Sequence, residues 1–104
     1  MNRALMLLGL CQRAGKLVSG EQAVVDSVRR GRAYAVLLDA AAARNTRKSV
    51  SDACRFREIP LREAPANELG DAIGKPGRMA VAITDEKLSA RILELTDLQN
   101  TIGG

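Results

Sequence analysis

The feature that most constrains the fold is the alternation of amphipathic helical segments with short, mostly apolar runs. Residues 33–38 (AYAVLL) and 79–84 (MAVAIT) are the two strongest runs, and both are bounded by turn-forming residues. Apolar residues spaced three and four apart, as in residues 2–13, indicate instead a helix with one buried face. Short apolar strands that alternate with helices are typical of a sheet covered on both sides. The order therefore predicts an α/β/α layered sandwich with a largely buried sheet.

Caps and stop signals place the other elements. Ser19 and Gln22 have the spacing of an S-x-x-Q capping box, so a helix is expected to open at Ser19 and to stop at Gly31. Asp85 is expected to cap the last helix. In order, the predicted elements are a helix at 2–13, a strand at 16–18, a helix at 19–31, a strand at 33–38, a helix at 44–57, a strand beginning at 59–61, a helix at 67–73, a strand at 79–84 and a last helix after 85. At this length we expect one domain, residues 1–104.

Composition excludes several classes of site. The chain has no histidine, so no histidine base, nucleophile or metal ligand is available. Its two cysteines, Cys11 and Cys54, cannot close a four-ligand zinc site. Both lie in apolar helical settings, which favours buried, reduced thiols over a disulfide. We predict no bound metal and no cofactor.

No transmembrane helix is predicted, because no stretch reaches about 18 apolar residues. The apolar run near the N-terminus is interrupted by Gln12, Arg13 and Lys16, which fits an amphipathic helix better than a signal peptide. We therefore expect a cytoplasmic protein that does not engage a membrane.

The positive charge is distributed unevenly. Residues 1–57 hold 11 Lys and Arg against 4 acids, whereas residues 58–104 hold 5 against 8. Of the 16 basic residues 12 are arginine, the residue better suited to forked phosphate contacts and to stacking on bases. A small domain with one basic half suggests a polyanionic partner.

Part of this charge forms a stripe in the helix predicted at 44–57. Arg44, Lys48, Ser51 and Arg55 recur at i, i+4, i+7 and i+11, with Arg47 beside them. Such a stripe is either a solvated helix face or a surface that contacts phosphates.

Three further arginines, at 29, 30 and 32, are first of all charges that favour a helix C-terminus. The chain has one Tyr and one Phe, too few rings for a base-stacking platform of the RRM or OB type.

The segment between residues 15 and 22 resembles a phosphate-binding loop but fails the pattern. A P-loop requires Gly-Lys-Ser/Thr where this chain has Gly20-Glu21-Gln22. The same residues could read base edges, since Glu21 accepts hydrogen bonds, Gln22 donates and accepts, and Gly20 permits close backbone approach. Alternatively, Glu21 only complements the helix dipole. Because no pair of acids suits acid–base catalysis, we predict that the chain is not an enzyme and binds no small-molecule substrate.

Several segments together resemble a known family. They are LLGLCQRAGKLVSGEQAV, the turn RGRA into AVLLD, Asn45-Thr46, the spacing from Cys54 to Ile59-Pro60, ELGDAIGK and MAVAITD. The chain resembles the ribosomal L7Ae/L30e family of kink-turn RNA-binding proteins over about residues 3–95, and most closely its bacterial YlxQ-type, ribosomal-protein-like subgroup.

The resemblance implies a three-layer α/β/α sandwich with a four-stranded mixed sheet. It also implies a non-catalytic function: binding structured, kink-turn-like RNA in association with the ribosome. The implied partners are ribosomal RNA or another kink-turn RNA, with ribosomal proteins as further candidates. The subgroup motif Ser-Gly-Glu matches Ser19, Gly20 and Glu21, and the family loop that packs against RNA corresponds to residues 73–79.

From these arguments we predict an RNA-binding face that includes residues 13–16, 44–48 and 75–78. The predicted contact residues are Arg13, Lys16, Ser19, Gly20, Glu21, Gln22, Arg44, Asn45, Lys48, Ile73, Lys75 and Arg78.

Three residues depart from the family pattern. Asp26 stands where the family has a lysine, and Ala40 and Ala41 stand at positions that are commonly acidic. These departures support an alternative, a protein-interaction module on the same fold with weakened or lost RNA binding.

Overall fold

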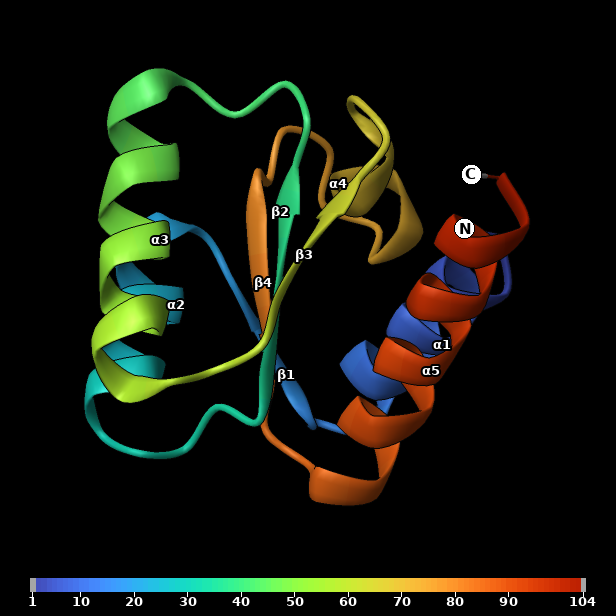
Figure 1. The fold of residues 1–104 in the computed structure, drawn as a ribbon, viewed down its shortest axis with the longest axis horizontal. Helices are drawn as coiled ribbons and strands as arrows, with labels where there is room; N and C mark the ends of the chain where they lie inside the picture. The colour runs from blue at the N-terminus through green and yellow to red at the C-terminus, as the bar shows by residue number, and fades with distance from the viewer. Residues whose placement is uncertain (1, 104) are drawn as a thin grey trace.

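The computed structural model describes the backbone of residues 2–103 and the side chains of residues 3–98. Helices and strands alternate along the chain, as the sequence predicts (Figure 1). The elements are α1 (Asn2–Arg13), β1 (Leu17–Ser19), α2 (Glu21–Arg29), β2 (Ala35–Asp39), α3 (Arg44–Arg57), β3 (Leu61–Ala64), α4 (Glu68–Ala72), β4 (Ala80–Ile83) and α5 (Glu86–Gly103).

The four strands form one mixed sheet in the order β1-β4-β2-β3. Strand β4 is antiparallel to both β1 and β2, and β3 is parallel to β2. In the register, Ala82 pairs with Val18 on one side and with Val36 on the other. Strands β1, β2 and β3 therefore all end at the sheet edge where β4 begins.

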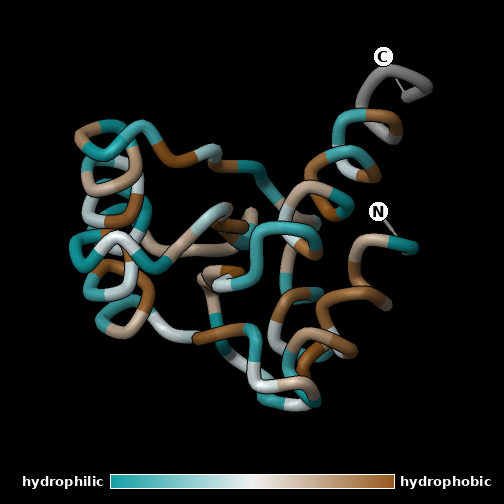
Figure 2. The backbone as a smooth tube through the Cα atoms, turned by 90° about the horizontal axis from the view of Figure 1, so that it is seen from below, coloured by the Kyte–Doolittle hydropathy of each residue, from teal (hydrophilic) through white to brown (hydrophobic). Residues whose placement is uncertain are grey.

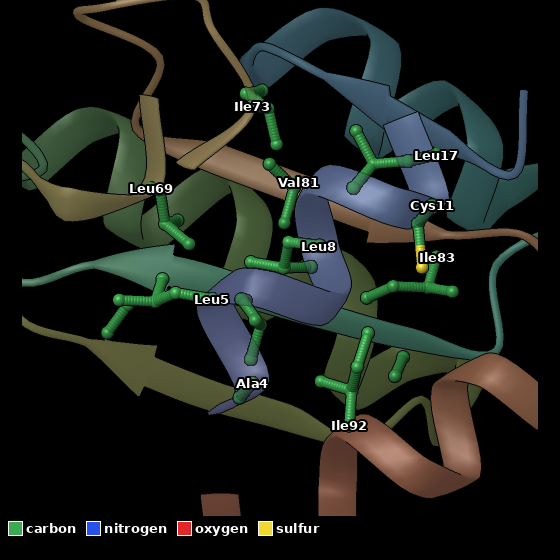
Figure 3. Close-up of a cluster of buried hydrophobic side chains, with 13 residues drawn as sticks. Ala4, Leu5, Leu8, Cys11, Leu17, Leu69, Ile73, Val81, Ile83 and Ile92 are labelled. Carbon is green, nitrogen blue, oxygen red and sulfur yellow. The ribbon is translucent and has the colours of Figure 1, made fainter. Parts of the chain in front are cut away.

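Helices cover both faces of the sheet, so the predicted three-layer sandwich is confirmed. Helices α2 and α3 lie on one face and α1, α4 and α5 on the other (Figure 1). Alternation along the strands supplies both cores. Leu37, Val81 and Ile83 belong to the core on the α1–α5 side, whereas Val36 and Leu38 belong to the core under α2 and α3. Figure 3 shows Val81 and Ile83 in the first of these cores.

The capping-box prediction is wrong, whereas the Asp85 cap is confirmed. Ser19 is the last residue of β1 and pairs with Val81, so Gly20 becomes the N-cap of α2, which has no side-chain cap. Because strand pairing extends one residue further than the pattern indicated, the Ser19 hydroxyl does not reach the helix. An oxygen of Asp85 accepts a 2.9 Å hydrogen bond from the Leu88 N–H, as expected of a cap.

Both cysteines are buried and free, which confirms the predicted reduced thiols. Cys11 belongs to the core under α1, and Cys54 to the core under α3 on the opposite face of the sheet. Desolvation raises the pKa of Cys54 to about 11.

Among the described residues, no helix has the length and apolar character needed to cross a membrane. The tube in Figure 2 shows that α1, next to the N-terminus, is hydrophobic over most of its length.

Candidate nucleic-acid interface

Most of the predicted contact residues meet at one edge of the sheet, where β1, β2 and β3 end and β4 begins. The Gly20 N–H donates to the Ala80 carbonyl, and the Asp39 N–H to the Met79 carbonyl. These bonds bring three segments together, residues 19–22, 40–48 and 74–79. We call this surface the Gly20 edge; it lies at the upper end of the sheet in Figure 1.

Gly20 and Arg78 form the closest contact at this edge. The backbone of Gly20 has φ +98° and ψ 149°, a conformation essentially restricted to glycine. A guanidinium nitrogen of Arg78 donates a 3.1 Å hydrogen bond to the carbonyl of Ser19. A Cβ atom on Gly20 would lie only 2.6 Å from that same nitrogen. Because Gly20 has no side chain, the Arg78 guanidinium can occupy the space beside its backbone.

Two helices point their N-termini at this edge. Neither α2, with Gly20 as N-cap, nor α3, with Ala43 as N-cap, receives a side-chain cap. The two first turns are joined by a 2.6 Å hydrogen bond that the Thr46 hydroxyl donates to the Glu21 carboxylate. Open N–H groups and the positive ends of two helix dipoles favour an anion here.

Four cations surround these helix starts with exposed side chains: Arg44, Lys48, Lys75 and Arg78. Among the described residues, Arg44 and Lys75 form no ion pair, and Lys48 pairs with Asp52 at 3.0 Å. Arg47, in contrast, is held within the structure. It pairs with Glu63 at 2.8 Å and donates to the carbonyls of Asp39 and Ala40.

The loop that carries Lys75 and Arg78 rests on Gly70 of α4. A Cβ atom on Gly70 would lie 2.6 Å from the Lys75 carbonyl oxygen and 3.0 Å from the backbone nitrogen of Arg78. Ile73, predicted as an RNA contact, is only 6% exposed and packs in the core with Val81 (Figure 3). That prediction is wrong as a surface contact, since the amphipathic turn of α4 points Ile73 at the sheet.

Asp39 ties the loops of the edge together. Its carboxylate is fully buried and accepts hydrogen bonds from the N–H groups of Ala41 and Asn67, both at 2.8 Å, and of Leu69 at 3.4 Å. The end of β2 is thereby fixed to the start of α4. The motif AVLLD contains Asp39, but nothing in the sequence indicated this role.

The comparisons with known proteins bear on this geometry. A model of the ribosomal protein L7Ae/L30e/S12e/Gadd45 family matches residues 3–93. The chain belongs to this family.

Two relatives and two solved structures are similar to this L7Ae-family chain. RNA-binding protein YlxQ of Bacillus subtilis is 41% identical over 88% of this chain and 92% of its own length. RNA-binding protein YlxQ of Enterococcus faecium is 34% identical over 91% of this chain and 92% of its own length. A Bacillus halodurans protein of unknown function superposes with a TM-score of 0.86 at 36% identity, covering 90% of this chain and 96% of that one. The Giardia lamblia 15.5kD RNA binding protein shares the fold, with a TM-score of 0.72 at 21% identity. The match covers 90% of this chain and 84% of that one.

The structure divides the predicted L7Ae-family contact residues. Glu21, Gln22, Asn45 and the four edge cations have exposed side chains at the Gly20 edge, and Ser19 and Gly20 are half-buried there. Lys16 does not join them, whereas a guanidinium nitrogen of Arg13 lies back along α1, 3.7 Å from the position of a Cβ atom on Gly9. The Lys16 carbonyl accepts from the Thr84 N–H beyond the end of β4, at the opposite edge of the sheet. The prediction that Lys16 belongs to this face is therefore wrong, because β1 runs between it and Gly20.

Asp26, which departs from the lysine that the family resemblance predicts, lies on the exposed side of α2. It pairs with Arg30 at 3.2 Å, and both side chains are more than half exposed. Ala40 and Ala41 are exposed at the Gly20 edge.

Among the described residues, no group of three potential metal ligands comes together.

Proposed function

We propose that this chain is a single-domain, non-catalytic RNA-binding protein that contacts structured RNA through the Gly20 edge. The observation that carries the proposal is the meeting of two open helix N-termini with four exposed cations at one edge. Phosphate oxygens are the anions that such a surface suits best. The names of the two YlxQ relatives, both RNA-binding proteins, support the same ligand class.

The carboxylates of the edge support a non-catalytic role. Glu21 accepts from Thr46, and Asp39 accepts from three backbone N–H groups. These hydrogen bonds give each carboxylate a positioning role, which for Glu21 is compatible with a contact to a base edge. Glu21 and Gln22 are exposed beside the N-terminus of α2 and suit contacts to base edges, while the cations suit phosphates.

We further propose a kink-turn-like target in cytoplasmic ribosomal RNA or another structured RNA, with ribosomal proteins as neighbours. Support comes from the Ser19-Gly20-Glu21 motif, which stands at the start of α2, and from the loop 74–79 beside it. A bent RNA with two helical arms could contact both segments at once.

Salt-dependent binding tests this proposal directly. Filter binding should use a kink-turn RNA, total ribosomal RNA and a straight duplex of the same length as the kink-turn RNA. If the four exposed cations each contact one phosphate, the slope of log K against log salt should be about −2.8 to −3.6. Kink-turn RNA should bind more tightly than the straight duplex. No salt-sensitive binding to any of these RNAs would refute the proposal.

The alternative, a protein-interaction module, is favoured by one separate observation. Met6 and Leu10 on α1 are 73% and 52% exposed, and with Leu7 and Leu95 they line a shallow groove between α1 and α5. Apolar side chains in such a group suit a protein partner. Affinity capture from lysate with and without RNase separates the two functions, because partners held by protein contacts survive RNase.

A further inference from the structure

The chain's single phenylalanine faces solvent. Phe56 is 83% exposed near the end of α3, and the core beneath that helix is formed without it, by Val50 and Cys54 among others. Phe56 lies two residues beyond Cys54, about 200° round the helix axis, so it points away from the sheet. The ring therefore contributes nothing to the core and is available to a ligand.

The surroundings of Phe56 are basic and grooved. A shallow groove between α2 and α3 is lined by Arg29, Ser49, Asp52, Ala53, Phe56 and Arg57. The Arg57 guanidinium carbon lies 6.0 Å from the centre of the Phe56 ring. The acid in the groove, Asp52, is engaged by Lys48 at 3.0 Å and by Arg55 at 3.8 Å. An aromatic ring flanked by guanidinium groups suits an unpaired base and its phosphates.

This groove is connected to the Gly20 edge by the outer face of α3. Arg44, Lys48 and Arg55 follow one another along that face, and Lys48 and Arg55 are 76% and 80% exposed. Twelve residues of helix separate Arg44 from Phe56, a rise of about 18 Å. Stacked nucleotides advance about 3.4 Å each, so about six nucleotides cover this distance.

We propose that a single-stranded segment continuing from the structured RNA runs along the outer face of α3 and stacks one unpaired base on Phe56. The proposal rests on the RNA-binding function proposed above and extends its surface. In this arrangement Arg44, Lys48 and Arg55 contact the phosphates, and the Phe56 ring stacks on the base. A single ring holds one base, which distinguishes this site from the multi-ring platforms of RRM and OB proteins.

The first test compares kink-turn RNAs that differ only in a tail. One RNA is blunt, one carries six uridines at the 5′ end and one carries six at the 3′ end. We expect one tail to tighten binding by about 5- to 150-fold, the range for stacking one base on an aromatic ring. Phe56→Ala should remove this gain and leave the affinity for blunt RNA unchanged. Phe56→Tyr should retain the gain. Met6→Ala, which trims another exposed apolar side chain, is the matched control.

The second test uses fluorescence, because the chain has no tryptophan. Phe56→Trp creates a single probe whose emission should be quenched by the tailed RNA and not by the blunt RNA. Met6→Trp should show no such difference. If blunt RNA binds but neither tail raises affinity nor quenches the probe, the Phe56 site is refuted while the Gly20 edge stands. If no RNA binds in a salt-sensitive way, the underlying RNA-binding function fails instead.

Discussion

The Thr46 hydroxyl donates a 2.6 Å hydrogen bond to the Glu21 carboxylate, linking the first turns of two helices that are 25 residues apart in the chain. The bond fixes where the only exposed acid at the start of α2 points. Since Glu21 is the proposed base reader, Thr46 is the residue that positions it.

A double-mutant cycle tests this relationship. Glu21→Ala should weaken binding of kink-turn RNA by roughly 5- to 150-fold, the range for one base contact. Thr46→Val, which keeps the shape and removes the hydroxyl, should weaken it less. The double variant should bind about as well as Glu21→Ala alone, because Thr46 acts through Glu21. Additive losses, measured by filter binding at fixed salt, would show that the two residues act separately.

Gly20→Ala should disturb both stability and RNA binding. Alanine at φ +98° is strained, and its Cβ would collide with Arg78, so we expect a loss of about 1–3 kcal/mol in the free energy of unfolding. A displaced Arg78 should also reduce the salt slope of RNA binding by about one phosphate contact. Urea denaturation and salt titration measure the two effects.

Gly31→Ala is the matched control for Gly20→Ala. Gly31 also has a positive φ, +72°, but a Cβ there meets nothing within 4 Å. The control should cost some stability and leave the salt slope unchanged. An unchanged slope in Gly20→Ala as well would mean that Arg78 does not contact RNA.

The helices were the most predictable part of the fold. Helix α3 occupies residues 44–57 as expected, and α1 ends at Arg13 as expected. Helical periodicity is a local signal that neighbouring elements rarely override at these lengths. The Ser19 cap failed because pairing with Val81, a residue distant in sequence, decides where β1 ends.

The site was predicted only in part, since its geometry depends on contacts distant in sequence. Lys16 is close to Gly20 in sequence, yet a three-residue strand places it at the opposite edge of the sheet. Thr46 and Gly70 were missed for the converse reason: their partners lie in other elements. A glycine inside the predicted helix 67–73 was the one available signal, because such a glycine often marks close backbone packing.

Asp39→Ala should destabilise the protein by at least about 2 kcal/mol. The substitution removes the acceptor of two part-buried N–H groups, those of Ala41 and Asn67, and of the buried N–H of Leu69. Asp39→Asn keeps one acceptor oxygen and should cost less. Urea denaturation of both variants measures the difference. Equal losses would mean that the single oxygen kept by Asn contributes nothing, and that the full carboxylate is required.

The raised pKa of Cys54 predicts that the protein loses stability at alkaline pH. Burial raises its pKa from 9.0 to about 11, so the folded state retains the thiol proton more tightly than the unfolded chain does. The resulting stability is fully present below pH 9.0 and is lost as the pH rises to about 11. A shift of this size corresponds to about 2–3 kcal/mol. Urea denaturation from pH 8 to 11 should show a smaller decline in Cys54→Ala than in the parent; parallel curves would contradict the assignment.

Asp26→Lys should strengthen binding to kink-turn RNA. The substitution replaces a negative charge by a positive one on the exposed side of α2, about one and a half turns from Glu21. The Asp26–Arg30 pair that it removes is exposed on both sides, so the free energy of unfolding should fall by less than about 1 kcal/mol.

Asp26→Asn separates the two effects of that substitution. If removing repulsion is enough, Asn should give part of the gain, and Lys should add a steeper salt slope by about one contact. The measurement is a salt titration of the parent and both variants on kink-turn RNA, with a straight duplex alongside. Unchanged or weaker kink-turn binding by Asp26→Lys would mean that the RNA does not approach this side of α2, and would confine the interface to the helix starts and the loop at 74–79.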